Sequence, residues 1–282
     1  MSDIIKDKLW DIITGQATAS EAEWLQQKST AAPLELMTAF VSTPRFLAKK
    51  IIEITAEEQW GLNAEIPGFS VHGWSLVRLS RVWLLTQLDP SDKADYVRHI
   101  ETLFDTAEMN ELVALYSALP LLSYPEQWLF RATDAVRSNM GFVFDAIALR
   151  NPYPDKYFSE LAWNQLVLKT IFNDKPIHLI EGLENRANEK LAYTLSDFAH
   201  ERWAAGRSVP PQVWRLAGKF LNQNLLPDMQ HLFYSPDEDD RKAAALACAD
   251  SDFNHAHYLL AKYTDLERSV KTGALTWAQL EY

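Results

Sequence analysis

Residues 151–172 read NPYPDKYFSELAWNQLVLKTIF, and this stretch decides the expected fold class. Pro152 and Pro154 punctuate a turn, and a segment with helical character follows it. At about 100° per residue, apolar side chains fall on every side of that helix. A helix with this pattern is usually enclosed by protein. The stretch therefore predicts a helical protein in which this segment is surrounded by other helices.

Four polar residues interrupt the apolar pattern of this helix. Enclosed amides and charges must be hydrogen-bonded or ion-paired, so these residues are candidates for specific polar chemistry. One interpretation is a binding pocket with an acid, base or hydrogen-bond anchor and an anion partner. The other is structural: the amides hold loop carbonyls and the lysine extends to solvent. The four residues are Glu160, Asn164, Gln165 and Lys169. Three residues just upstream could extend the same surface, namely Arg137, Asn139 and Arg150.

The rest of the chain is also dominated by helical periodicity, and strand-like alternation is nearly absent. Many helices joined by short loops predict antiparallel neighbours. We expect an all-α fold of stacked antiparallel helix pairs, an α-solenoid of the HEAT or armadillo kind, with a compact multi-helix bundle as the alternative. Residues 1–282 are expected to form one domain. It would contain N-terminal helices (1–54), a loop (55–73), the main helical stack (74–261) and a C-terminal segment (262–282).

Composition restricts the function classes. The 282 residues are 48% hydrophobic, which is enough for a sizeable core and excludes global disorder. The formal net charge of −11 argues against non-specific nucleic-acid binding, which needs a positive field. It also argues against docking on an anionic membrane by charge alone. Neither a secretory signal nor a run of about 18 apolar residues is visible. We therefore expect a cytoplasmic protein without membrane insertion. A peripheral position at the inner membrane is compatible with this expectation.

Motifs for catalysis or metal binding are missing from the sequence. The single cysteine, Cys248, lies in an alanine-rich segment and is expected in the core. The acidic run at residues 237–240 follows Ser235-Pro236 and is typical of a helix start. There is no phosphate-binding glycine loop, zinc-protease helix or nucleophile elbow. No cofactor or metal is expected, and the sequence favours a protein that is not an enzyme.

The chain resembles the EboA family of bacterial metabolite-traffic proteins. The most specific part of the resemblance is the Asn-Pro-Tyr-Pro turn at residues 151–154 followed by Glu-x-Ala-Trp-Asn-Gln at 160–165. Similar stretches occur at residues 110–120, 144–148 and 199–207. The resemblance adds three residues to the candidate binding set, namely Asn151, Tyr153 and Trp163.

The resemblance implies a setting rather than a reaction. It implies an operon that also encodes a prenyltransferase-like membrane protein and metal-dependent TIM-barrel or hydrolase-type proteins. That operon is associated with processing or moving secondary-metabolite precursors toward the periplasm. The first hypothesis is therefore a non-catalytic helical scaffold or metabolite-binding accessory protein. Its partners would be other proteins of the pathway, including the membrane prenyltransferase-like protein, and a small-molecule ligand. The alternative is an enzyme that acts on a small prenylated or aromatic precursor, with Glu160 as general acid or base.

Overall fold

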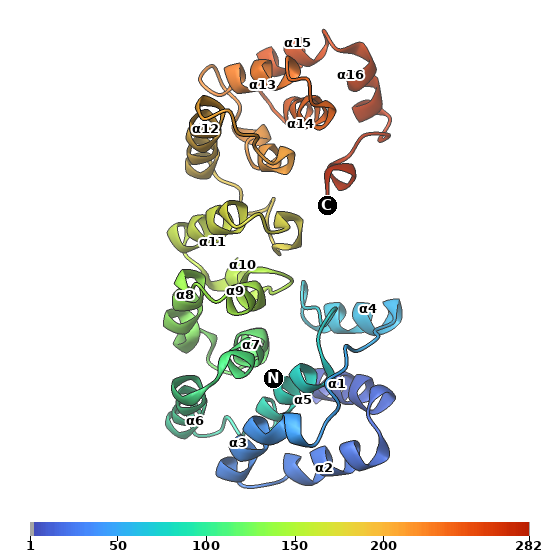
Figure 1. The fold of residues 1–282 in the computed structure, drawn as a ribbon, viewed down its shortest axis with the longest axis vertical. Helices are drawn as coiled ribbons and strands as arrows, with labels where there is room; N and C mark the ends of the chain where they lie inside the picture. The colour runs from blue at the N-terminus through green and yellow to red at the C-terminus, as the bar shows by residue number, and fades with distance from the viewer. Residues whose placement is uncertain (1–2, 282) are drawn as a thin grey trace. The chain divides into compact units, whose positions relative to one another are not determined.

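A computed structural model describes residues 3–281 of the chain (Figure 1). Its contacts divide the chain into two compact units, Met1–Trp163 (the N-terminal unit) and Asn164–Tyr282 (the C-terminal unit). In the described residues every regular element is an α- or 3-10 helix, apart from one isolated bridge between Ile51 and Ser75. The prediction of an all-α protein is confirmed. The single domain and its solenoid arrangement stay predictions.

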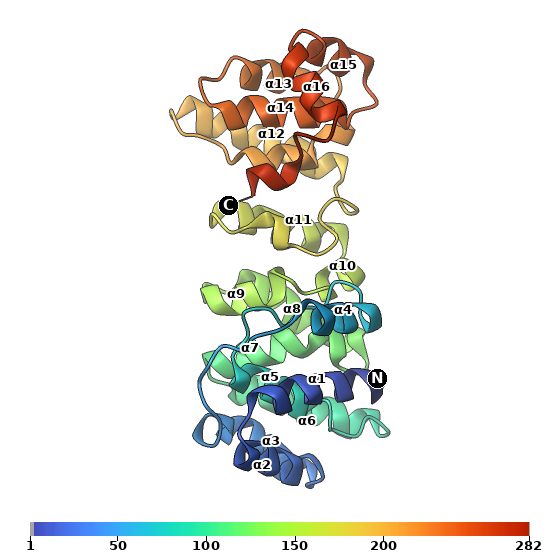
Figure 2. The same cartoon turned by 90° about the vertical axis from the view of Figure 1, so that its right-hand side faces the viewer.

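Ten α-helices and three 3-10 helices (η) lie within the described part of the N-terminal unit. Figure 2 shows them in a second orientation. In chain order they are α1 (Asp3–Gln16), α2 (Ala19–Ser29), α3 (Pro33–Ser42), η1 (Thr43–Arg45), α4 (Ala56–Glu65), α5 (Leu76–Leu85), α6 (Lys93–Thr106), α7 (Met109–Ala118), η2 (Leu119–Leu121), η3 (Pro125–Trp128), α8 (Leu129–Arg137), α9 (Gly141–Ala148) and α10 (Tyr153–Tyr157). Helix α11 (Glu160–Phe172) runs across the boundary between the units.

Helix α5 is the enclosed centre of the N-terminal unit. It contacts α1, α2, α3 and α7, and α7 in turn contacts α9 (Figure 1). Ser75 starts α5 as its N-cap, because its hydroxyl accepts a hydrogen bond from the Arg78 N–H at 3.1 Å. Every residue from Leu76 to Leu85 except Arg78 is buried. Helix α5 is therefore surrounded by other helices, as an enclosed helix was expected to be.

Helix α11 is less enclosed than its sequence suggested. Leu161 is 69% exposed and Phe172 is 56% exposed, although Trp163 and Leu166 are fully buried. An apolar pattern on every side is compatible with burial of the whole helix, but burial also requires another part of the protein to pack against each side. The expectation of complete enclosure is wrong for this helix.

The segment 55–73, expected as a loop, contains helix α4. Thr55 and Glu58 form a capping box: the Thr55 hydroxyl accepts from the Glu58 N–H, and the Glu58 carboxylate accepts from the Thr55 N–H. These bonds satisfy backbone groups at the start of a short helix. Gly61 lies inside α4, whereas Pro67, Gly68 and Gly73 fall after its end at Glu65, where the chain does form the expected irregular loop.

The described C-terminal unit contains five α-helices that lie wholly within it. The elements are η4 (Ile177–Leu179), α12 (Glu189–Ala204), η5 (Pro211–Leu216), η6 (Gly218–Phe220), α13 (Leu226–Phe233), α14 (Glu238–Ala249), α15 (Asn254–Leu260), α16 (Thr264–Lys271) and η7 (Trp277–Leu280). Helix α14 is central and contacts α13, α15, α16 and η5 (Figure 1). Its alanine-rich face permits this close packing, and Cys248 lies in the core there as expected.

Candidate functional site

The four polar residues predicted on α11 take up separate environments. Glu160 and Gln165 are exposed. Asn164 is 7% exposed and exchanges two amide hydrogen bonds with Asn188, at 3.1 and 2.8 Å. Lys169 is half-buried, and this desolvation lowers its pKa. For Asn164 the structure therefore provides the internal partner that the structural interpretation required.

Asn151 and Tyr153 hold the turn that leads into α10. The Asn151 amide donates to the carbonyls of Tyr116 and Ala146, at 3.0 and 2.9 Å, and its oxygen accepts from the Tyr153 N–H. The Tyr153 hydroxyl donates to the Pro125 carbonyl at 2.5 Å, and burial raises its pKa. Both side chains are buried and use their polar groups for internal bonds. This geometry explains why these residue types stand in the turn without requiring a ligand.

The remaining predicted residues do not gather into one cavity wall. Arg137 is exposed at the end of α8, Asn139 is exposed two residues later, and Trp163 is fully buried. Glu160 is exposed in the first turn of α11, whereas a general acid or base of the expected kind works within a concave pocket. A binding role for the predicted set stays a prediction.

A pocket of about 530 Å³ lies elsewhere, within the N-terminal unit. It is lined by residues of helices α5 and α7. Residues in and after η1, in the segment before α5 and at the start of α9 also line it. Its lining residues are Pro44, Lys49, Ile51, Gly73, Ser75, Val77, Arg78, Arg81, Glu108, Asn110, Glu111, Val113 and Phe142. The volume is within the range of small-molecule sites.

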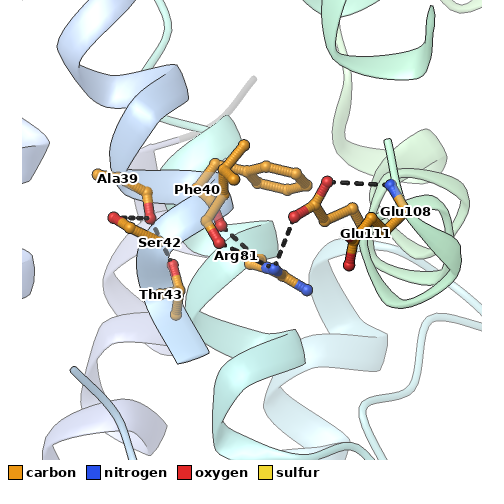
Figure 3. Close-up of polar contacts among 8 residues, drawn as sticks. Ala39, Phe40, Ser42, Thr43, Arg81, Glu108 and Glu111 are labelled. Atoms are coloured by element: carbon orange, nitrogen blue, oxygen red, sulfur yellow. Dashed lines mark hydrogen bonds and ion pairs between the residues drawn. The ribbon is translucent and has the colours of Figure 1, made fainter. Parts of the chain in front are cut away.

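Arg81 is anchored beneath this pocket by three groups (Figure 3). Its Nε donates to the Phe40 carbonyl at 2.9 Å, and Nη2 donates to the Val41 carbonyl at 3.2 Å and to Glu111 Oε1 at 3.1 Å. Burial lowers the pKa of Arg81, and the attraction of Glu111 opposes that shift. Arg81 is only 3% exposed, so these partners compensate a cation that has lost its water.

Arg78 lies one helical turn before Arg81 and is much less completely bonded. Its Nε donates to the Ser117 hydroxyl at 2.8 Å, and its guanidinium lies 4.3 Å from the Trp74 ring centroid. Within residues 3–281, Nη1 and Nη2 of Arg78 donate no hydrogen bond. Burial lowers the pKa of Arg78 to about 9, and the attraction of the Asp145 carboxylate opposes that shift. Arg78 is half-buried, and it therefore brings a partly desolvated positive charge and unused N–H donors to the pocket wall.

The rim of the pocket combines charge with apolar surface. Ile51 is 63% exposed and Phe142 is 66% exposed, and both line the pocket together with the exposed Lys49. An anion with an apolar body matches this combination, because a guanidinium binds a carboxylate or phosphate through parallel hydrogen bonds. The arrangement can hold such a ligand by charge at one end and by apolar contact at the other.

Sequence reasoning missed Arg78 and Arg81, although a local signal exists. Residues 76–85 read LVRLSRVWLL, and two arginines three positions apart interrupt an otherwise almost apolar helix. Arginine is almost never fully buried unless it is paired, so such a pattern indicates internal partners. Those partners, Phe40 and Glu111, lie 41 and 30 residues away and cannot be read from the helix itself.

The C-terminal unit contains a serine, a histidine and an aspartate in contact, but not in a hydrolase arrangement. The Asp228 carboxylate is 1% exposed; it accepts from Ser196 Oγ at 2.6 Å and lies 2.6 Å from His200 Nε2. The aspartate therefore stands between the other two, whereas a catalytic histidine must receive the serine proton directly. Among residues 3–281, no group of three or more potential ligands could hold a metal ion.

Comparison with known proteins places the chain in a family. The family model described as "Metabolite traffic protein EboA" matches residues 5–218, which include the whole Arg78 pocket. No curated protein and no solved structure gives a significant match. Within the described residues, no helix is both long and apolar enough to cross a membrane. Because the family model matches well over half of the 282 residues, this chain belongs to the EboA family of metabolite-traffic proteins.

Proposed function

We propose that this protein is a non-catalytic accessory protein that binds a small anionic metabolite in the Arg78 pocket. The observation that carries the proposal is the bonding of Arg78: one N–H is used by Ser117, and neither Nη atom has a hydrogen-bonded partner in the described chain. Arg78 is half-buried, so these two N–H groups can reach the open pocket. An anion that accepts from Nη1 and Nη2 would form charge-assisted hydrogen bonds, which are stronger than bonds between neutral groups.

The neighbouring residues make the pocket suitable for binding and release rather than for chemistry. Arg81 and Glu111 neutralise each other, and Ser117 uses its hydroxyl to accept from Arg78. An anion carrier needs a positive contact and an apolar surface, and this pocket supplies both features. The description of the family as metabolite-traffic proteins supports the same role.

The binding test uses benzoate and benzamide as probes that share an apolar ring and differ in charge. We expect titration calorimetry to show about 10- to 100-fold tighter binding of benzoate, because a charge-assisted bond contributes about 1.5–3 kcal/mol. In methyl-labelled protein, benzoate should shift the resonances of Ile51 and Val77, which line the pocket. Equal binding of the two probes, or shifts confined to other methyl groups, contradicts the proposal.

A matched pair of variants tests the role of the charge. Arg78→Met keeps an unbranched side chain against Trp74 but removes the cation. Arg98→Met removes an exposed arginine of α6. The first variant should lose the preference for benzoate over benzamide, and the second should retain it. An unchanged preference in Arg78→Met would show that another group binds the anion.

The pathway setting extends the proposal. We infer that the ligand is a secondary-metabolite precursor and that the protein passes it to other proteins of the same pathway, including a membrane prenyltransferase-like protein. This setting implies a cytoplasmic protein that associates peripherally with the inner membrane. Co-purification of the tagged full chain with the membrane fraction and with pathway proteins tests the setting; recovery from neither contradicts it.

A further inference from the structure

A second cavity of the N-terminal unit shares no lining residue with the Arg78 pocket. Its volume is about 310 Å³, and it is lined by residues of α1, α2 and α5 and by Gln87, which follows the end of α5. The lining side chains are polar or charged except for two tryptophans, Trp10 and Trp83. The volume is at the lower end of the range of small-molecule sites. The cavity therefore has space for one small ring.

The two tryptophans form an aromatic wall of this cavity. Their ring centroids lie 4.6 Å apart, and the ring planes are inclined by 28°, so the rings are stacked. Trp83 is 6% exposed, whereas Trp10 is half-buried and leaves part of its ring open to the cavity that it lines. An indole ring offers a large, rigid apolar surface to a partner. The C–H groups of a ring-shaped ligand can pack against the open part of Trp10.

Trp83 also brings a hydrogen-bond donor to the cavity. A tryptophan buried as deeply as this one usually donates its indole N–H to an acceptor. Within residues 3–281, Trp83 Nε1 donates no hydrogen bond, yet it is not one of the polar atoms that are sealed from solvent without a partner. The N–H therefore keeps an accessible edge. Because Trp83 lines the cavity, an acceptor held there can reach that edge.

Two hydrogen-bond acceptors line the same cavity. Gln87 Nε2 donates to the Trp83 carbonyl at 3.1 Å and to the Thr86 hydroxyl at 2.9 Å, which fixes the orientation of the amide and leaves Oε1 as its unused atom. Asp7 is exposed, and its carboxylate has no hydrogen bond or ion pair within residues 3–281. An ionised carboxylate only accepts hydrogen bonds. The cavity thus combines one N–H donor with two acceptors beside an aromatic wall.

This combination of groups favours one class of ligand over two others. An ammonium group donates but cannot accept, so it leaves the Trp83 N–H without a partner. An anion is repelled by the Asp7 carboxylate, because the neighbouring Lys6 is already paired with Asp3 at 3.5 Å. A hydroxyl group both donates and accepts. A ring with several hydroxyls can therefore satisfy Trp83, Gln87 and Asp7 together.

We propose that this cavity is a binding site for a neutral polyhydroxylated ring of the pyranose type. The C–H face of the ring packs on Trp10, and one hydroxyl accepts from Trp83 Nε1. Other hydroxyls donate to Gln87 Oε1 and to the Asp7 carboxylate. The site is independent of the Arg78 pocket, and its ligand belongs to a different chemical class from the anion proposed there.

Methyl β-glucopyranoside and tetrahydropyran are the probes for this proposal, because they share a ring and only the glucoside has hydroxyls. In protein with isotope-labelled indole N–H groups, the glucoside should shift the Trp83 resonance with a Kd of about 1 mM. Tetrahydropyran should bind at least about tenfold more weakly, because it can form no donor bond to Gln87 or Asp7. Equal affinities overturn the proposal. The absence of any Trp83 shift at about 100 mM glucoside, where such a site is saturated, overturns it as well.

Benzylammonium tests the competing class of ligand, since it joins an aromatic ring to a cation. If it shifts the Trp83 indole resonance at a lower concentration than the glucoside does, the cavity is a cation site and the proposal is overturned. Methyl resonances of Ile51 and Val77 report separately on the Arg78 pocket. Glucoside shifts confined to those two residues would place the sugar in that pocket and also overturn the proposal.

Two variants of the full chain complete the test. Asp7→Ala removes one acceptor from the cavity, and Asp11→Ala replaces an exposed aspartate of the same helix that does not line it. Both side chains are exposed, so both variants should fold. The affinity for the glucoside should fall about three- to tenfold in Asp7→Ala and stay unchanged in Asp11→Ala. An unchanged affinity in Asp7→Ala, or an equal loss in Asp11→Ala, overturns the proposal.

Discussion

Arg81 and Glu111 form an ion pair in the interior of the N-terminal unit, with 3.1 Å between Nη2 and Oε1. The two side chains are 4% and 8% exposed. Glu111 also accepts from the Glu108 N–H at 3.1 Å, so the pair connects α5 with the capping box that starts α7 (Figure 3). Because Arg78 lies one turn away on α5, the same contacts hold the helix that presents Arg78 to the pocket.

Removing one partner of this pair should destabilise the protein strongly. Glu111→Leu leaves the Arg81 guanidinium buried without its carboxylate, and we expect a loss of about 3–5 kcal/mol in the free energy of unfolding. Urea denaturation measures the change. Glu267→Leu is the matched control, because Glu267 is 25% exposed, its partner Lys271 is 70% exposed, and such a partly solvated pair should change stability by only about 0.5 kcal/mol. Similar losses in the two variants would mean that burial does not strengthen the pair.

Anion binding in the Arg78 pocket should depend on pH in a defined direction. Burial lowers the pKa of Arg78 to about 9, so the guanidinium is protonated at neutral pH and loses its charge as the pH rises through 9. We expect benzoate affinity to be constant between about pH 6 and 8 and to weaken at higher pH, which is the direction that a lowered pKa of Arg78 sets. Titration calorimetry across this range measures the affinity. In Arg78→Met the weak residual binding should show no such step, and a step that remains there would assign it to another group.

The amide pair between Asn164 and Asn188 should contribute to stability rather than to ligand affinity. Asn188 is also the N-cap of α12, where its oxygen accepts from the Leu191 N–H at 3.0 Å. Asn188→Ala removes the cap and leaves the Asn164 amide without its partner, so we expect a loss of about 2–3 kcal/mol in unfolding free energy. Asn188→Ser retains a capping hydroxyl and should lose less. Benzoate affinity is the second readout, and a fall in either variant would restore Asn164 as a binding residue.

Two glycine substitutions should change stability in opposite directions. A Cβ atom at Gly218 would lie 2.9 Å from the Ala247 carbonyl oxygen on α14, so Gly218→Ala forces the backbone of η6 and α14 apart. We expect it to cost about 1–3 kcal/mol. Gly15 lies near the end of α1 with open space around it, and Gly15→Ala should stabilise by up to about 1 kcal/mol. Thermal denaturation measures both, and a stable Gly218→Ala would show that η6 and α14 are not tightly packed.

Several features of the fold were predictable because they depend on neighbours in sequence. Helical periodicity, the absence of strand-like alternation and the core position of Cys248 all agree with the structure. The acidic run at 237–240 does form the start of α14, with Asp237 as its N-cap. The loop expected at 55–73 is wrong in its first half, where the Thr55 and Glu58 capping box, itself a local pattern, starts α4.

The sequence alone determined that helices form and that the chain resembles its family, since both follow from short patterns of residue types. Only the tertiary structure decided which apolar helix is enclosed: α5 is buried almost throughout, whereas α11 leaves Leu161 and Phe172 exposed. It also decided that, within residues 3–281, neither Nη atom of Arg78 nor Oε1 of Gln212 has a hydrogen-bond partner. The physical reason is that burial and pairing depend on groups far away in the chain, such as Leu280, which lies 68 residues from Gln212.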